Sequence, residues 1–192
     1  NFANICLEAI ASKKGQFKKV NLFFEDESRF GLFTRNGKAL TAKGVKPICP
    51  FHQVFKSLYL YGAFSPVNGD YFMLELPTCN ASIFQIFLDE FSKQNPEELK
   101  IMVLDNGAFH KAHKLIIPNN IVLIFLPPYS PELNPAEKVW AKFKRDFTNR
   151  LFETLDDLEN YLCKTAISLK ASEVISICSF SYIFLNPFWT II

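Results

Sequence analysis

The chain has 192 residues, of which 49% are hydrophobic, so it is long and apolar enough to bury the core of one domain. Twenty-one phenylalanines and an aromatic content of 15% exclude an intrinsically disordered chain. The net charge is only +2, which by itself neither indicates nor excludes a polyanionic partner. The five cysteines form no CxxC pair, so neither a zinc site nor a disulfide framework is expected.

The two ends of the chain raise the question of targeting and membrane segments. Charged residues interrupt the first apolar stretch, so no signal peptide is expected there. The 19 residues after Glu173 carry no charge, but serines, Asn186 and Pro187 interrupt them. We expect a terminal strand and a packed tail, with a membrane anchor as the less favoured alternative.

The first half of the chain is typical of antiparallel strands joined by turns. A β-rich run, VNLFFED, stops at acidic residues, and FGLFTR follows before a hairpin-type turn at Asn36-Gly37. SLYLYGAF and DYFMLEL flank a second pair, Asn68-Gly69, which predicts another hairpin.

The second half alternates helical and strand patterns. Asn80 can cap a helix that ends at Asn95-Pro96, and the apolar runs IMVLD and IVLIFL then predict two buried strands. A proline-rich loop, PPYSPELNP, precedes a helix from Pro135 to about Arg150 and another from about Leu155 to Leu169. This order predicts an α/β fold with a mixed sheet and helices packed on it.

Three acidic residues lie at the ends of predicted strands or at the start of a predicted helix, where side chains from distant parts of the chain can converge. Asp26 follows the first strand, Asp105 ends IMVLD, and Glu137 lies in the first turn of the later helix. Carboxylates are the ligands that Mg²⁺ prefers, and two such ions about 4 Å apart can activate water and stabilise the leaving oxygen of a phosphodiester. The pattern therefore predicts clustered carboxylates that hold two divalent ions.

Each acid also has a purely structural explanation. Asp26 could cap a loop, with Glu27 as the important acid instead, and Asp105 begins Asp-Asn-Gly, a common turn sequence. Glu137 stands three residues after Asn134, as in a capping box. Its place beside the apolar stripe of the helix, away from the lysines, favours contact with the sheet.

The strings FFEDESRFG, MVLDNGAFHKA and LPPYSPELNPAEKVW closely resemble the DDE transposases of the Tc/mariner superfamily, particularly its bacterial insertion-sequence branch. The resemblance extends from about residue 19 to about residue 185, and the third string is long and specific. It implies a ribonuclease-H-like fold, with a mixed five-stranded sheet flanked by helices. Residues 17–192 would form this catalytic domain, residues 1–16 would end an upstream linker or helix, and the family's N-terminal helix-turn-helix region would be absent.

The resemblance also implies roles for particular residues. Asp26, Asp105 and Glu137 would be the catalytic, metal-binding acids, although the segment between the last two is slightly shorter than usual. Asn106 and His110 would position the substrate, while a histidine bound to a backbone carbonyl is the simpler account of His110. A set of basic residues would contact DNA, although solvated side chains are the favoured explanation: Arg29, Arg35, Lys38, Lys138, Lys142, Lys144 and Arg145.

The function implied is metal-dependent cleavage of DNA at transposon ends, followed by strand transfer into target DNA. The cofactor would be two Mg²⁺ ions, with Mn²⁺ as a substitute, and the partners would be DNA and a second copy of the chain. No membrane and no small-molecule substrate are expected, and the location would be the bacterial cytoplasm at the nucleoid, or a eukaryotic nucleus. Two alternatives stay open: a decayed or truncated transposase that only binds DNA or assembles, and another ribonuclease-H-like nuclease such as a junction resolvase.

Overall fold

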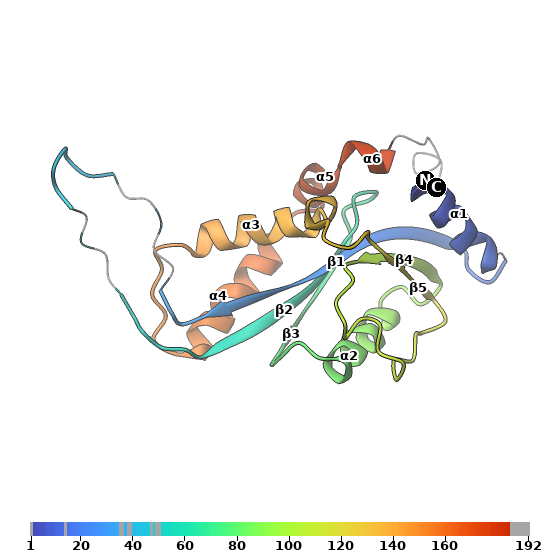
Figure 1. Cartoon of the computed structure of the whole chain (residues 1–192), viewed down its shortest axis with the longest axis horizontal. Coiled ribbons are helices and arrows are strands. Elements are labelled where there is room, and N and C mark those ends of the chain that lie inside the picture. Colours follow the sequence, from blue (N-terminus) through green and yellow to red (C-terminus); the bar gives the residue numbers. More distant parts are fainter. Residues whose placement is uncertain are drawn as a thin grey trace.

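The computed structural model describes residues 2–13, 15–34, 37, 40–46, 48 and 51–184. Figure 1 shows a twisted sheet with helices on both faces. In chain order the elements are α1 (Phe2–Ser12), β1 (Lys19–Gly31), β2 (Ser57–Phe64), β3 (Tyr71–Leu76), α2 (Ala81–Lys93), β4 (Glu98–Leu104), β5 (Ile121–Phe125), the 3₁₀ turn η1 (Pro131–Leu133), α3 (Ala136–Phe147), α4 (Leu155–Ser168), α5 (Ala171–Cys178) and α6 (Ser181–Phe184).

The sheet has five strands in the order β3-β2-β1-β4-β5. Strands β1, β2 and β3 are antiparallel neighbours, whereas β4 runs parallel to β1 and β5 runs parallel to β4. The predicted mixed five-stranded sheet, with its first three strands antiparallel, is confirmed. Its long central strand, β1, carries the first acidic motif.

Two apolar cores hold the helices against the sheet. Helix α2 covers one face, and the side chains of Phe84, Phe87, Leu88 and Phe91 are fully buried there. Helices α1 and α3 to α6 contribute to the core on the opposite face, where α3 buries Ala136, Val139, Trp140, Phe143 and Phe147. Asn80 caps α2 as predicted, since its side chain accepts hydrogen bonds from the backbone N–H groups of Ser82 and Ile83.

Strand β1 does not stop at the acidic residues, so that prediction was wrong. Its pairing with β2 continues from Phe24, opposite Phe64, to Gly31, opposite Ser57. Backbone pairing does not depend on side-chain charge, so the ladder runs through all three acids even though the Glu25 side chain is fully buried. The acidic motif is therefore held on a rigid strand instead of a loop.

The connection after β1 is also longer than the predicted hairpin at Asn36-Gly37. The ladder continues with hydrogen bonds from Leu32 N to the Lys56 carbonyl and from Thr34 N to the His52 carbonyl. The chain then makes an excursion beyond the end of the sheet (Figure 1). Asn36 lies outside the described residues. The second predicted hairpin is correct, with Gly69 at φ +79° between β2 and β3.

The C-terminal segment is helical as far as the structure describes it, which corrects the predicted terminal strand. Helix α5 begins after Lys170, whose backbone N–H donates to the Glu173 carboxylate. Val174 and Cys178, four residues apart, are buried on one face of α5, which contacts α3, and Ile183 of α6 is buried in the same core. Within the described part of the chain, none of the helices combines the length and apolar character needed to span a membrane.

Candidate functional site

Asp26 and Asp105 lie on neighbouring parallel strands. Phe24 of β1 is paired with Val103 of β4, and each aspartate stands two residues further along its strand direction. Because side chains alternate along a strand, Asp26 points to the face that buries Phe24, which is the face of α3. Asp105 follows the last residue of β4, and its carboxylate contacts His110 and the Gly107 N–H. The fold thus brings the first two predicted acids together at one point of the sheet.

Glu137 joins them from α3, where it is exposed in the first helical turn. Asn134 holds the start of this helix: its Oδ1 accepts from the Ala136 N–H at 3.1 Å, and its Nδ2 donates to the Glu25 carbonyl at 2.8 Å. Among the described residues, no hydrogen bond of a capping box involves the Glu137 side chain. Its carboxylate lies near enough to Asp26 for its charge to raise the pKa of that residue.

The pKa of Asp26 reflects this convergence of charge. Burial is the main cause that raises it to about 8, and the negative charge of Glu137 is the next. Glu27 and Asp105 add to the repulsion. The negative charges around the partly buried Asp26 form a site that a cation would neutralise.

Gly62 of β2 lies opposite Asp26 and allows α3 to pack closely above the strand. A Cβ atom at this position would lie 2.7 Å from the Trp140 ring and from the Phe64 ring, which are both buried. The absence of a side chain at residue 62 therefore sets how near the helix of Glu137 comes to the strand of Asp26.

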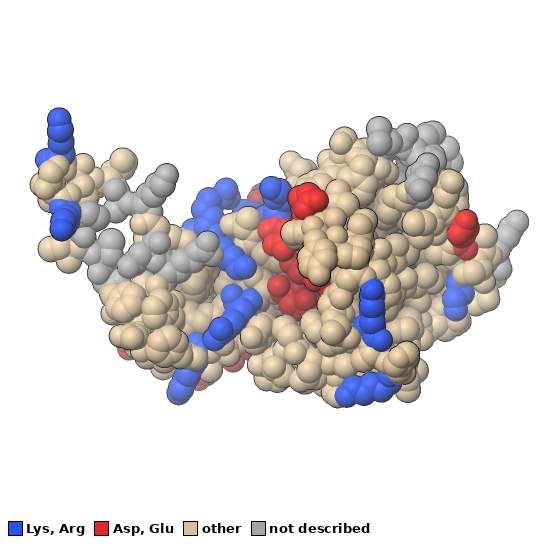
Figure 2. Space-filling view, in the orientation of Figure 1, with Lys and Arg blue, Asp and Glu red and all other residues tan. Residues whose placement is uncertain are grey.

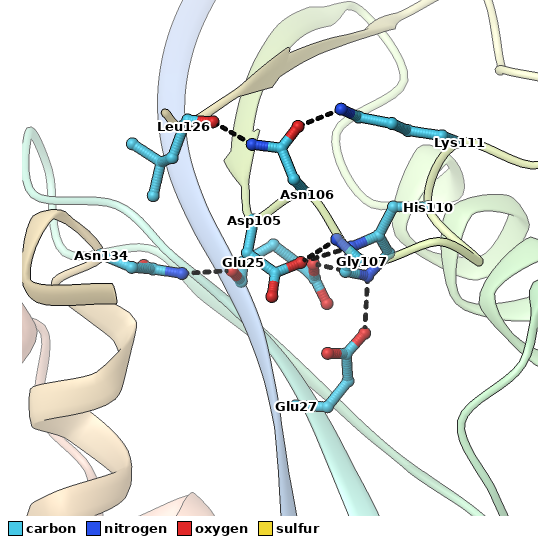
Figure 3. A network of polar contacts seen from close by, with 9 residues as sticks. All are labelled: Glu25, Glu27, Asp105, Asn106, Gly107, His110, Lys111, Leu126 and Asn134. Carbon is cyan, nitrogen blue, oxygen red and sulfur yellow. Dashed lines mark hydrogen bonds and ion pairs between the residues drawn. The ribbon is translucent and has the colours of Figure 1, made fainter. Parts of the chain in front are cut away.

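His110 links the acids on the other side of β1 (Figure 3). Its Nδ1 lies 2.9 Å from Oδ1 of Asp105, and its Nε2 lies 2.9 Å from Oε1 of Glu27. Burial acts to lower the pKa of His110, but the hydrogen bonds to Asp105 and Glu27 outweigh it and raise the pKa to about 9. The expectation of a backbone carbonyl partner was wrong, because two carboxylates bind this ring.

The acids near His110 are Asp105, Glu27 and Glu25, and their environments differ. The hydrogen bond from His110 holds the pKa of Asp105 below its usual value, with burial opposing and the Gly107 N–H assisting. Glu27, the alternative to Asp26, is turned away from α3 toward His110. Glu25 was not singled out from the sequence, yet its side chain is fully buried and burial raises its pKa well above the usual range.

Asn106 is occupied by contacts within the protein. Its Nδ2 donates to the Leu126 carbonyl and its Oδ1 accepts from Lys111 Nζ, so it ties the end of β4 to the end of β5 (Figure 3). It also lines a cavity of about 480 Å³ with Asp105 and the segment 126–131. Asn106 is thus beside the acids, but through these bonds it holds the loop in place.

Some of the predicted basic residues gather beside Glu137 and others do not. Glu137, Lys144 and Arg145 share a pocket of about 250 Å³, and Lys144 also lines a second pocket of about 350 Å³ with Arg29 and Lys56. Figure 2 shows lysines and arginines next to the acidic surface. Lys138 is exposed, and Nζ of Lys142 lies 3.2 Å from Oε1 of Glu173. Arg35 and Lys38 lie outside the described residues.

Comparison with known proteins agrees with this arrangement. A family model described as "DDE superfamily endonuclease" matches residues 21–159. A protein of Sinorhizobium fredii (strain NBRC 101917 / NGR234), named "Uncharacterized protein y4pE/y4sA", is 40% identical over 108 residues, which are 55% of this chain and 79% of the relative.

Solved structures of Mos1 transposase share the fold. The paired-end complex with the left transposon end has a TM-score of 0.66 at 17% identity, covering 97% of this chain and 57% of that chain. The Mos1 mariner paired-end complex with Mn has a TM-score of 0.65 at 17% identity, covering 91% and 55%. The present chain therefore spans little more than half the length of these proteins, and the likeness confirms the ribonuclease-H-like fold.

Proposed function

Because the chain belongs to the DDE superfamily endonucleases, as the match over residues 21–159 shows, we propose that it is the catalytic domain of a transposase of the Tc/mariner type. It would cleave DNA at transposon ends and transfer the freed 3′ end into target DNA. The observation that carries this proposal is that Glu137, from α3, and Asp105, just after β4, lie close enough to Asp26 of β1 for their charges to raise its pKa. Family membership favours the enzyme over a remnant that only binds DNA.

The three acids fit two divalent ions. Burial together with the charges of Glu137 and Asp105 raises the pKa of Asp26, so the cluster favours a bound cation. Mg²⁺ is the proposed ion and Mn²⁺ a substitute; when bound, the pair would supply an activated nucleophile and stabilise the leaving oxygen. The protein's own part is positioning: β1 and β4 hold two acids rigidly, and the Asn134 anchor holds the third.

DNA is the proposed substrate, and its phosphates would lie along the basic side of the site. Lys144 and Arg145 share the pocket of Glu137, so a scissile phosphate at the acids would leave its neighbours near these cations. A second copy of the chain, bound to the paired ends, is the proposed partner. The proposed location is wherever the element's DNA is: the nucleoid, or a nucleus.

The test is Mg²⁺-dependent cleavage of a plasmid that carries the element ends, with the end-binding region supplied on the full-length protein. Glu137→Gln keeps the size and helix propensity of the side chain but removes its charge, and cleavage should fall by at least about 100-fold. Glu132→Gln, at an exposed glutamate of η1, is the matched control and should cleave normally. Normal cleavage by Glu137→Gln would refute its role in catalysis.

A further inference from the structure

The Glu25 carboxylate is buried without compensation. Its side chain is fully inaccessible, and neither of its oxygens has a hydrogen-bond partner. Its own backbone carbonyl is bonded by Asn134, but the closest polar group that faces the carboxylate is His110, with Nε2 3.7 Å from Oε2. The charged form of a carboxyl group buried like this is costly, so the group is neutralised either by a proton or by a cation bound beside it.

Two further ligand atoms meet this carboxylate. Oε1 of Glu27 lies 2.9 Å from Nε2 of His110, and the ligand atoms of Glu25, Glu27 and His110 all lie within 4.8 Å of one another. Ligands about 2.1 Å from a tetrahedral ion are about 3.4 Å apart. The separations of 2.9 Å and 3.7 Å lie on either side of that value, so small shifts of the side chains would admit an ion.

Asp105 orients the ring of His110, whose Nε2 must release its proton to bind a metal ion. Nδ1 lies 2.9 Å from Oδ1 of Asp105, which directs Nε2 toward the two glutamates (Figure 3). A carboxylate behind a histidine in this manner fixes the ring and its tautomer at metal sites and strengthens the ligand.

We propose that Glu25, Glu27 and His110 form a separate site for one divalent transition-metal ion, with Zn²⁺ as the best fit. Imidazole with two carboxylates suits Zn²⁺, whereas Mg²⁺ prefers oxygen ligands and retains its waters. The site lies on the α2 side of β1, opposite the face to which Asp26 points, because residues 25 and 27 alternate with residue 26. Through His110 the ion would fix the orientation of Asp105.

Metal content tests this without any measurement of cleavage. The full chain is stripped with a chelator, incubated with Zn²⁺ in excess Mg²⁺, passed through gel filtration and analysed by mass spectrometry for bound zinc. Cys163→Ser is introduced in every sample, because this exposed thiol could bind zinc by itself. One zinc per chain is expected. The double variant Asp26→Asn/Glu137→Gln, which removes two acids of the proposed magnesium site, should bind one zinc as well.

Glu25→Gln and His110→Gln should each weaken zinc binding at least about 100-fold, because each removes a ligand. Glu27→Gln, at a less buried position, provides a further variant if Glu25→Gln does not fold. An anomalous difference peak at the zinc edge, between the two glutamates and His110, would locate the ion in the unaltered protein. No zinc in the unaltered chain, or equal zinc in folded Glu25→Gln and Glu27→Gln, would overturn the site while leaving the proposed cleavage activity untouched.

Discussion

Asn134 joins the helix that carries Glu137 to the strand that carries Asp26. Its amide donates to the Glu25 carbonyl at 2.8 Å and its oxygen accepts from the Ala136 N–H at 3.1 Å. Asn134 is itself buried, so both bonds are shielded from water. One side chain thereby fixes the start of α3 relative to the residue before Asp26.

Removal of this side chain should reduce stability and cleavage together. Asn134→Ala loses both bonds and leaves a buried carbonyl without its donor, which should cost about 1–3 kcal/mol in urea unfolding. Asn134→Asp retains the acceptor for Ala136 but loses the donor to Glu25. Both variants should cleave more slowly in single-turnover assays, and wild-type cleavage by Asn134→Asp would show that the bond to Glu25 does not position Glu137.

Gly62 should not accept even a methyl group. In Gly62→Ala the new Cβ would lie 2.7 Å from the rings of Trp140 and Phe64, so α3 would have to move away from β1. We expect a loss of about 1–3 kcal/mol in unfolding free energy and a lower cleavage rate.

Gly31→Ala is the comparison for Gly62→Ala, since its Cβ would meet the Lys56 carbonyl at 3.0 Å, well away from the acids. It should leave the cleavage rate per folded molecule unchanged. If Gly62→Ala also cleaves normally per folded molecule, the close approach of α3 is not needed for activity.

Much of the fold could be predicted because the chain's local patterns agree with its tertiary structure. The Asn68-Gly69 pair predicted a turn, Asn80 predicted the start of a helix, and the apolar runs predicted strands, all of which the structure contains. The end of β1 could not be predicted, because acids inside a strand resemble a strand end unless their partners are known. The helices of the tail could not be predicted because a short, uncharged, apolar run fits a strand as well as a helix, although Val174 and Cys178 are four residues apart and share a buried face.

The candidate site, like the fold, could be predicted only in part. Asp26, Asp105 and Glu137 could be chosen from motifs, and their strand and helix positions bring them together. The partners of His110 could not be foreseen, since Glu27 is 83 residues away in the chain. Glu25 could not be singled out, since its buried state depends on the packing around it.

A pair of carboxyl groups away from the site should make stability depend on pH. Burial is the main cause that raises the pKa of Glu75 to about 7, assisted by a hydrogen bond with Glu159 and by its charge. The folded protein therefore keeps its proton where the unfolded chain loses it, so stability is full below about pH 4.5 and falls as pH rises through 7.

Glu75→Gln should consequently stabilise the protein at pH 8 and have little effect at pH 4.5. The gain should be about 1 kcal/mol, because solvent screens this partly exposed pair. Urea unfolding at both pH values measures it, with Glu8→Gln on the exposed side of α1 as the control. An equal change at both pH values would mean that Glu75 is not protonated in the folded state.

The basic residues of α3 should differ in their contribution to DNA binding. Lys144 and Arg145 line the pocket of Glu137, whereas Lys142 Nζ is 3.2 Å from Glu173 and 4.0 Å from Asp146. Each phosphate contact that is lost should reduce the slope of log affinity against log salt by about 0.9. Lys144→Gln and Arg145→Gln should therefore flatten the slope measured by fluorescence anisotropy.

Lys142→Gln is the matched control on the same helix. It should leave the salt slope unchanged, because its ammonium group is already paired within the protein, and it should slightly lower thermal stability through the lost contact between α3 and α5. Equal flattening by all three substitutions would indicate a diffuse electrostatic effect of net charge. In that case DNA would not lie specifically along the pocket of Glu137, Lys144 and Arg145.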